Sequence, residues 1–443
     1  MIFFRLQTKK YVLLYKISAM SENFKKLEAY NFWYGNQPDL GYKRVDYLNK
    51  IKDYCQNKLI KVIVGQRRIG KSYLLRQIAF DLIENGIPAT NILYINKEYI
   101  DFDFIKNYQE LDELIKEYKS TLKPEGKVYI FIDEIQNIAQ WERLINSYAQ
   151  HFMDSYEFFI SGSNAKMLSG ELASVLSGRY ISFEIFTFSF REYLGILGLD
   201  NSKQNYLNYM QHGGLPELFN LPNEETKRHY VQSVKDTVLL RDIIQRYAIK
   251  DPKLLEDLFI YVINNASTLL SISNIVQYLK AQNRKTSYDT IALYLGYIEE
   301  TFMIHKAQRY EIKGKELLNG NVKYYINDLA YRNFLYSGFA YGYGFQLENL
   351  VYLTLKRHGY DLYVGIVPNK EVDFVAKRGN NTLYVQCSYV MTEPTTIERE
   401  YASLEAIKDH YPKIVVSMDD IALPNKGGIE HILAWNLDAY LAQ

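Results

Sequence analysis

The sequence predicts an α/β fold whose centre is a five-stranded parallel sheet. The first observation is that short apolar stretches alternate with amphipathic ones from residue 61 onward, which is typical of parallel α/β sheets. The second is that one of these stretches, VYIFIDE, is almost continuously apolar, as expected of a strand buried on both faces. The five predicted strands are residues 61–64, 91–96, 127–134, 156–164 and 179–186.

Helices are predicted between these strands. Residues 72–86 place apolar side chains at helical spacing, and Gly86 supplies a stop. Residues 111–122 form a second amphipathic segment that ends before Pro124, and residues 141–152 form a third. Each of the first three strands is therefore followed by a helix that can cover the sheet.

The composition is that of an ordinary globular protein. The chain has 443 residues, of which 48% are hydrophobic and 23% charged, so it is long enough for several domains. A net charge of +1 excludes a global basic field for nucleic acid but leaves local patches open. The two cysteines, Cys55 and Cys387, lack metal or disulfide spacing, which favours a reducing, cytoplasmic location. No apolar run reaches the roughly 18 residues that span a bilayer, so no membrane partner is expected.

The stretch GQRRIGKS lies between the first strand and the first helix, and it has the spacing of a phosphate-binding loop. Its glycines permit backbone conformations that aim N–H groups at phosphate oxygens. The lysine places a charge on the β- and γ-phosphates of ATP, and the serine hydroxyl faces Mg²⁺. The predicted nucleotide-binding residues are Gly65, Gln66, Arg67, Arg68, Ile69, Gly70, Lys71, Ser72 and Tyr73. The minimal motif does not explain Arg67 and Arg68. These arginines either pair with acidic groups of a helical lid, predicted below for residues 191–250, or contact a partner.

A phosphate loop of this kind predicts a second strand that ends in a carboxylate. The stretch VYIFIDE ends in Asp133 and Glu134, one strand–helix unit after Lys71. We expect Asp133 and Ser72 to hold Mg²⁺, and Glu134 to polarise the attacking water. An inserted strand and an acidic residue directly after the metal ligand are typical of P-loop NTPases that carry their own catalytic glutamate.

Two further catalytic candidates follow the fourth strand. Ser163 stands where a strand tip would face the γ-phosphate, although Ser163 or Asn164 could equally cap a helix. Arg179 opens the fifth strand and could reach the nucleotide, or that of a neighbouring subunit, as an arginine finger. A surface ion pair is an equally good reading of Arg179.

The remaining chain divides into helical and mixed segments. We predict an N-terminal extension (1–30), an ATPase core (31–190), a helical lid (191–250), a winged-helix domain (251–340) and a nuclease-like α/β tail (341–443). The winged helix rests on three helices followed by a hairpin, with Ser287 as a cap of the third helix. Basic residues on this segment could contact DNA, namely Arg284, Lys285, Lys306, Arg309, Lys313 and Lys315. Acidic residues on the third helix favour a packing role instead.

Several stretches together resemble one family. GQRRIGKS, FIDEIQNIAQWERLI, ISGSNAKMLSGELASVLSGRY, FSFREYL, GGLPEL and KYYINDLAYRNFL are similar to bacterial and archaeal AAA+/STAND-type ATPases that carry a C-terminal DUF4143 domain. The resemblance covers residues 30–443. It implies an ATPase core, a winged-helix middle and a nuclease-like tail. It also implies that Pro216, in a Gly-x-Pro motif of the lid, approaches the nucleotide base.

The tail resembles PD-(D/E)xK nucleases but departs from their pattern. Glu348 and Asp373 match the metal-binding carboxylates, whereas Gln386 and Ser388 stand where a glutamate and a lysine are expected. A neutral amide is a poor Mg²⁺ ligand, and serine lacks the charge of lysine. We therefore expect a tail with impaired or absent cleavage, although Glu371 could rebuild a metal site.

These observations favour an ATPase whose Mg²⁺-dependent hydrolysis of ATP drives a conformational switch, coupled to DNA or to a protein partner. A binding module that turns ATP over slowly is the first alternative, and an active metal-dependent nuclease is the second. Oligomerisation remains open.

Overall fold

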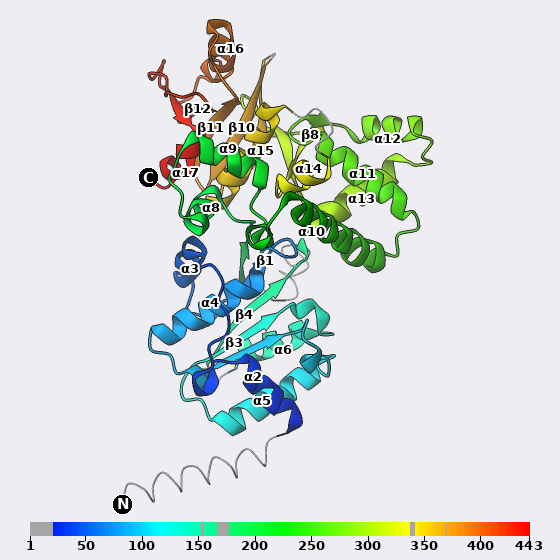
Figure 1. Cartoon of the computed structure of the whole chain (residues 1–443), viewed down its shortest axis with the longest axis vertical. Coiled ribbons are helices and arrows are strands. Elements are labelled where there is room, and N and C mark those ends of the chain that lie inside the picture. The colour runs from blue at the N-terminus through cyan, green and yellow to red at the C-terminus, as the bar shows by residue number, and fades with distance from the viewer. Residues whose placement is uncertain (1–20, 152–154, 166–175, 177, 337–341, 369) are drawn as a thin grey trace, which may run out of the picture. The chain divides into compact units, whose positions relative to one another are not determined.

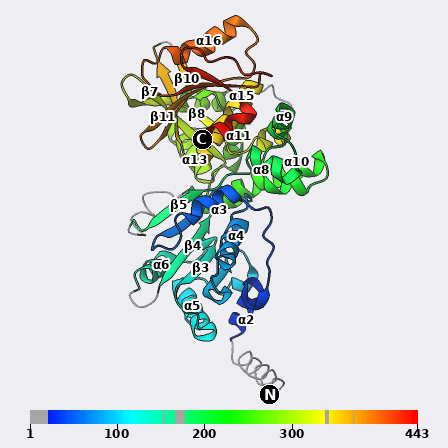
Figure 2. The same ribbon diagram turned by 90° about the vertical axis from the view of Figure 1, so that its left-hand side faces the viewer.

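The computed structural model describes residues 21–151, 155–165, 176, 178–336, 342–368 and 370–443. The chain forms two compact units. The first comprises the residues up to Gly65 together with Gly70–Glu184, and the second comprises Gln66–Ile69 together with Ile185–Gln443. Figures 1 and 2 show the elements of both units. Among the described residues, no helix combines the length and the apolar character needed to cross a bilayer.

The first unit contains the predicted parallel sheet. Its strands are β1 (Ile60–Val64), β2 (Ile92–Asn96), β3 (Val128–Asp133), β4 (Tyr156–Gly162) and β5 (Tyr180–Glu184). They lie in the order β2-β3-β4-β1-β5, and every neighbouring pair is parallel. The five-stranded parallel sheet is thus confirmed, and β4 is the strand inserted between β1 and β3.

Helices cover this sheet as the periodicity predicts (Figure 1). The α-helices are α2 (Glu22–Tyr30), α3 (Val45–Lys52), α4 (Lys71–Glu84), α5 (Tyr108–Leu122) and α6 (Trp141–Ala149). Short 3₁₀ turns are η1 (Trp33–Gly35), η2 (Ala89–Asn91), η3 (Ile100–Phe102) and η4 (Ile135–Asn137). The central helix α4 packs against β2, β3 and β4.

The predicted N-terminal extension is too long. Helix α2 buries Phe24 and Leu27 completely, and Phe24 stacks on Trp33 with ring centroids 5.6 Å apart. Asn31 also donates from its side chain to the carbonyl of Tyr94 on β2. Residues 22–30 therefore belong to the folded first unit rather than to an extension.

The second unit begins with helices and continues into a mixed sheet. Its helices are α8 (Phe190–Leu197), α9 (Lys203–His212), η6 (Pro216–Asn220), α10 (Glu224–Thr237), the π-helix η7 (Val238–Gln245), α11 (Pro252–Asn264), α12 (Ile272–Ala281), α13 (Tyr288–Glu300), α14 (Ala330–Leu335), α15 (Tyr343–Arg357), α16 (Pro394–Glu405), η8 (Ala434–Asn436) and α17 (Leu437–Leu441). Its strands are β6 (Leu269–Leu270), β7 (Ile304–Glu311), β8 (Glu316–Ile326), β9 (Asp361–Val367), β10 (Lys370–Arg378), β11 (Asn381–Ser388), β12 (Lys413–Ser417) and β13 (Ile429–Leu433).

Three helices precede a hairpin in this unit, in the order that the sequence predicts. They are α11, α12 and α13, followed by β7 and β8, and Ser287 caps α13 by accepting from the N–H of Thr290 at 3.2 Å. The short strand β6, which the sequence does not predict, pairs with β8. The limits of the predicted domains stay predictions.

All eight strands of the second unit form one sheet, in the order β13-β12-β11-β10-β9-β7-β8-β6. Strand β7 of the hairpin pairs in parallel with β9 through Arg309, Tyr310 and Glu311. Helix α15 packs with Phe374 and Ala376 in one apolar core, and helix α16 packs with Val375 in another. Because neighbouring strand residues point to opposite faces, the two helices cover opposite sides of the sheet.

Asn349 connects α15 to the β7–β8 hairpin through two hydrogen bonds. This fully buried amide donates to the carbonyl of Ile326 at 2.9 Å and accepts from the N–H of Ile326 at 2.8 Å. It therefore satisfies both backbone groups at the end of β8.

His431 on β13 predicts a pH dependence of stability. Its Nδ1 accepts from the N–H of Leu423 at 2.7 Å, so the neutral ring donates from Nε2 to Ser417, also at 2.7 Å. Burial lowers the pKa of His431, and Asp419 opposes this effect. Protons therefore bind His431 more tightly in the unfolded state than in the folded state. The contribution of neutral His431 to the free energy of unfolding is complete above about pH 6.5 and declines as the pH falls below that value.

We expect the melting temperature of the wild type to fall more steeply between pH 7 and pH 5 than that of His431→Gln. Circular dichroism melts at several pH values measure this difference. The exposed His410→Gln is the matched control and should follow the wild type. Parallel curves for the wild type and His431→Gln would contradict the assignment.

Candidate nucleotide-binding site

The carboxyl edge of the parallel sheet brings the predicted site residues together. Val64 at the end of β1 is in register with Gly162 at the end of β4, and Asn96 on β2 is in register with Asp133 on β3. The loops that follow these strands start at one edge, which is where ligands of open α/β sheets bind.

Lys71 lies beside the acidic end of β3. Gly70 has a left-handed φ of 90°, which glycine adopts without strain, and it caps α4. The N-terminus of this 14-residue helix is a favourable place for an anion, because the N–H groups of a first helical turn point along the axis toward it. The Lys71 ammonium donates to the carbonyl of Gly65 at 3.0 Å and lies 3.8 Å from a carboxylate oxygen of Glu134.

Asp133 has no exposed surface and is held from several sides. One carboxylate oxygen accepts from Asn96 at 3.0 Å and from the hydroxyl of Tyr94 at 3.3 Å, and the other accepts from Ser161. Burial raises its pKa, as does the neighbouring Glu134, while hydrogen bonds from Ser161 and Ser72 lower it. Ser72 and Asp133 thus lie together as predicted, and this hydroxyl–carboxylate pair fits the oxygen ligands that Mg²⁺ prefers.

The supporting residues Asn96 and Tyr94 are not among the predicted ones. A signal for Asn96 exists, because NILYIN ends in a polar side chain at the carboxyl end of a strand. Tyr94 carries no such signal, because an apolar strand often includes tyrosine.

Glu134 is oriented by two side chains. Its backbone has a φ of 54°, which is uncommon for a residue other than glycine. One carboxylate oxygen accepts from Gln136 and, at 3.3 Å, from the hydroxyl of Ser163. The predicted pair Glu134 and Ser163 is therefore in contact, next to Lys71.

Arg179 does not join this group within its own chain. It precedes β5, and its carbonyl accepts from the N–H of Ile60 at the amino end of β1. Ile60 and Val64 are four residue steps apart along β1, which is roughly 13 Å, so the backbone of Arg179 lies at the opposite edge of the sheet from the loop. The approach of Arg179 to the nucleotide of the same chain stays a prediction, and its side chain would have to span this distance. A role toward a neighbouring subunit stays a prediction.

Tyr73 points its side chain away from the sheet's edge. Its hydroxyl donates to Asp39 at 3.3 Å, and the guanidinium of Arg76 covers its ring at 4.3 Å. Only its backbone N–H remains for the predicted contact with nucleotide.

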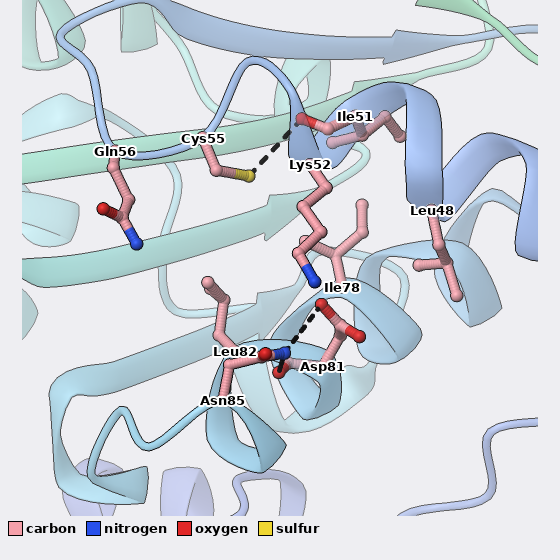
Figure 3. A pocket seen from close by; sticks show the side chains of 9 residues that line it. All are labelled: Leu48, Ile51, Lys52, Cys55, Gln56, Ile78, Asp81, Leu82 and Asn85. Atoms are coloured by element: carbon pink, nitrogen blue, oxygen red, sulfur yellow. Dashed lines mark hydrogen bonds between the residues drawn. The ribbon is translucent and has the colours of Figure 1, made fainter.

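A pocket of about 300 Å³ in the first unit is separate from the loop. It lies between α3 and α4 and is lined by Leu48, Ile51, Lys52, Cys55, Gln56, Ile78, Asp81, Leu82 and Asn85 (Figure 3). The lining residues that α4 supplies lie in its second half, whereas Lys71 and Ser72 stand in its first turn. Burial raises the pKa of Cys55 to about 11, which disfavours a reactive thiolate there.

The crest of the loop, Gln66–Ile69, is part of the second unit. The Gln66 side chain accepts from the amide of Asn327 at 2.9 Å and donates to the hydroxyl of Tyr331. Arg67 forms two bonds to Asp242 of the π-helix η7, at 3.1 and 3.2 Å. Arg67 thus pairs with an acidic group of the predicted lid segment, while Arg68 is exposed. Ile69 is completely buried.

The GGLPEL stretch is fixed inside the second unit. Asp328 accepts from the N–H of Gly214 at 2.8 Å, and a Cβ on Gly213 would lie 2.1 Å from the same carboxylate. Pro216 follows as the first residue of η6. The contact of Pro216 with a nucleotide base stays a prediction.

The predicted DNA-contact residues are partly engaged within the chain. Arg284 forms an ion pair with Asp257 at 2.6 Å, beside a pocket of about 620 Å³. Glu299 on α13 accepts from the hydroxyl of Tyr324 at 3.2 Å. One of the acidic residues of the third helix therefore contacts the hairpin.

Two family matches cover successive parts of the chain. Residues 57–194 match an AAA domain family, and residues 203–340 match a domain of unknown function, DUF8612. The AAA resemblance is confirmed for residues 57–194, whereas residues 203–340 match DUF8612 and a DUF4143 domain over residues 341–443 is not shown. The parallel sheet, the loop and the AAA match together identify the first unit as an AAA-type P-loop domain.

The chain belongs to the same family as an uncharacterised protein of Haemophilus influenzae. The two are 34% identical over 400 residues, which is 89% of this chain and 98% of that protein. An uncharacterised protein of Methanocaldococcus jannaschii is 33% identical over 375 residues, which is 79% of each chain.

Solved structures share only a general likeness. They include a Thermotoga maritima RuvB Holliday junction branch migration motor (15% identity, TM-score 0.30, 58% of this chain and 85% of that one). Others are Aeropyrum pernix ORC1 in complex with DNA (12%, 0.33, 68% and 94%) and AMPPCP-bound DnaA from Aquifex aeolicus (16%, 0.30, 60% and 90%).

Proposed function

We propose that this protein is a Mg²⁺-dependent ATPase that acts as a nucleotide-driven switch on DNA or a protein partner. The observation that carries the proposal is the arrangement at the sheet's carboxyl edge. Ser72 and Asp133 would hold Mg²⁺, and Lys71 and Ser163 each lie within contact distance of Glu134 beside them.

Each residue has a chemical task in this proposal. The amides of the loop and the Lys71 ammonium bind the phosphates, and Mg²⁺ held by Ser72 and Asp133 neutralises their charge. Glu134 accepts a proton from the attacking water. Hydrogen bonds from Gln136 and Ser163 hold the carboxylate of Glu134 in its orientation. Ser163 is also placed to sense the γ-phosphate.

The direct test is hydrolysis of ATP by the full chain with and without Mg²⁺. We expect Lys71→Ala to lose ATP binding and, with it, at least about 100-fold in kcat/KM, because the phosphates lose their counter-charge. Exposed Lys123→Ala should behave as the wild type. Turnover by Lys71→Ala at the wild-type rate would refute the assignment. Assays with and without DNA separate a DNA-stimulated motor from a binding module with slow turnover.

The switch part of the proposal rests on the crest of the loop. Arg67 and Asp242 are 10% and 3% exposed in their side chains, and such charge-assisted pairs contribute about 1.5–3 kcal/mol. A change in the loop backbone on nucleotide binding would therefore displace Arg67 and alter its ion pair with Asp242 on η7. A π-helix is a frequent element of functional sites.

We expect Arg67→Ala to raise the KM for ATP roughly tenfold and to remove any ATP-dependent change in hydrogen exchange over residues 238–245. The control is Arg228→Ala, which removes an exposed arginine of α10 outside the loop and should leave both quantities unchanged. Unchanged exchange and unchanged KM in Arg67→Ala would contradict the coupling.

A further inference from the structure

A buried lysine lies among the carboxylates of the nuclease-like tail. The Lys323 ammonium on β8 is 2.9 Å from Glu348 on α15, 2.8 Å from Glu371 on β10 and 3.5 Å from Asp373 on β10. Strands β8 and β10 are not neighbours, because β7 and β9 lie between them in the sheet. Lys323 therefore reaches the two predicted metal ligands from a distant part of the sequence.

The other bonds of these carboxylates are also made by the protein. Glu348 accepts from the hydroxyl of Tyr325 at 2.7 Å, and Asp373 accepts from the N–H of Cys387 at 2.8 Å. The Gln386 side chain accepts from the backbone N–H of Asp373 at 3.4 Å and donates from its amide to Glu400 at 2.9 Å. Side chains and backbone of the chain therefore supply these bonds, while the Glu371 side chain stays 31% exposed.

The lysine and the carboxylates of this cluster shift one another's pKa values. The side chains of Lys323, Glu348 and Asp373 are 5%, 8% and 11% exposed. Burial alone would lower the pKa of Lys323, but Glu348, Asp373 and Glu371 outweigh it and raise that pKa. Burial and the charge of Asp373 raise the pKa of Glu348 to about 8, and Lys323 opposes them.

We propose that Lys323 is the built-in cation of this cluster and takes the place that a divalent metal would need between Glu348, Glu371 and Asp373. The separations are those of N–H···O bonds, longer than the roughly 2.0–2.6 Å of Mg²⁺ or Ca²⁺ to oxygen. An ammonium and a divalent ion cannot share this space, because they repel and compete for the same oxygens. Among the described residues, no group of three or more potential ligands is arranged around a common metal position. This inference does not depend on the ATPase proposal.

The experiment counts Mn²⁺ ions bound by the nucleotide-free full chain, using the electron paramagnetic resonance signal of free Mn²⁺. We expect Lys323→Met to bind one Mn²⁺ more than the wild type, because its apolar stem is similar but its charge is gone. Lys323→Arg keeps a cation and should bind as the wild type does. Adding Asp373→Asn to Lys323→Met should remove the extra ion. A folded Lys323→Met with no extra ion would overturn the proposal.

A second test does not require Lys323→Met to fold. Asp373→Asn in the wild-type background should leave the Mn²⁺ count unchanged, and supercoiled plasmid and single-stranded DNA should stay intact in Mn²⁺. Loss of a bound ion in Asp373→Asn would overturn the proposal. So would Mn²⁺-dependent cutting by the wild type that Lys323→Met abolishes, since Lys323 would then serve a cleavage site.

Discussion

Glu134→Gln should reduce ATP hydrolysis by roughly 10²–10⁴-fold while ATP binding remains, which is the usual cost of losing a general base. The variant keeps the size of the side chain and can still bond to Gln136 and Ser163, but it cannot accept a proton from water. The loop and Lys71 are unchanged, so the affinity for ATP should be within a few-fold of the wild type.

Single-turnover hydrolysis and equilibrium binding of a fluorescent ATP analogue separate these two quantities. Glu142→Gln, in the first turn of α6, is the control and should hydrolyse ATP normally. Hydrolysis by Glu134→Gln at the wild-type rate would show that another group activates the water. Equal loss of binding and hydrolysis would indicate a structural role for Glu134 instead.

Glu157→Ala should destabilise the first unit by about 3–5 kcal/mol, because it leaves a buried charge without its partner. The Glu157 and Lys61 side chains have no exposed surface, and they form an ion pair. Glu157 also accepts from the N–H of Gln56 at 2.9 and 3.0 Å and pairs with Lys127 at 3.1 Å. Burial lowers the pKa of Lys61, and Glu157 is the main group that opposes this.

The measurement is urea unfolding followed by tryptophan fluorescence. Trp33 and Trp141 lie in the first unit and Trp435 in the second, so a Trp435→Phe background makes the signal specific to the first unit. Exposed Glu125→Ala should shift the free energy of unfolding by less than about 0.5 kcal/mol. A loss below about 1 kcal/mol in Glu157→Ala would mean that water reaches Lys61.

Much of the site could be predicted because its signals are local. The loop from Gly65 to Ser72 is one short segment between a strand and a helix, and Asp133 and Glu134 follow a strongly apolar strand. Both signals depend on neighbours in the sequence, and strands that run in parallel then bring their ends to one edge.

The features of the site that the sequence does not predict depend on distant contacts. The separation of Arg179 from the loop depends on the edge of the sheet at which β5 starts, and no motif indicates that edge. Tyr94 and Lys323 contact side chains of other elements, and the partners of Lys323 lie 25 and 50 residues away. Hydrophobic periodicity predicts which face of a helix or strand is buried. It does not predict which polar side chain from another element contacts that face.

The pairing of β7 with β9 has a consequence for how this protein can be divided. A chain cut at residue 340, where the DUF8612 match ends, would leave β7 with unpaired backbone groups from Arg309 to Glu311. The hairpin and the tail are therefore halves of one sheet, and each lacks an edge that the other supplies. We expect the hairpin and the tail to be gained and lost together in evolution. A relative that carries one without the other needs a different strand to pair with the exposed edge.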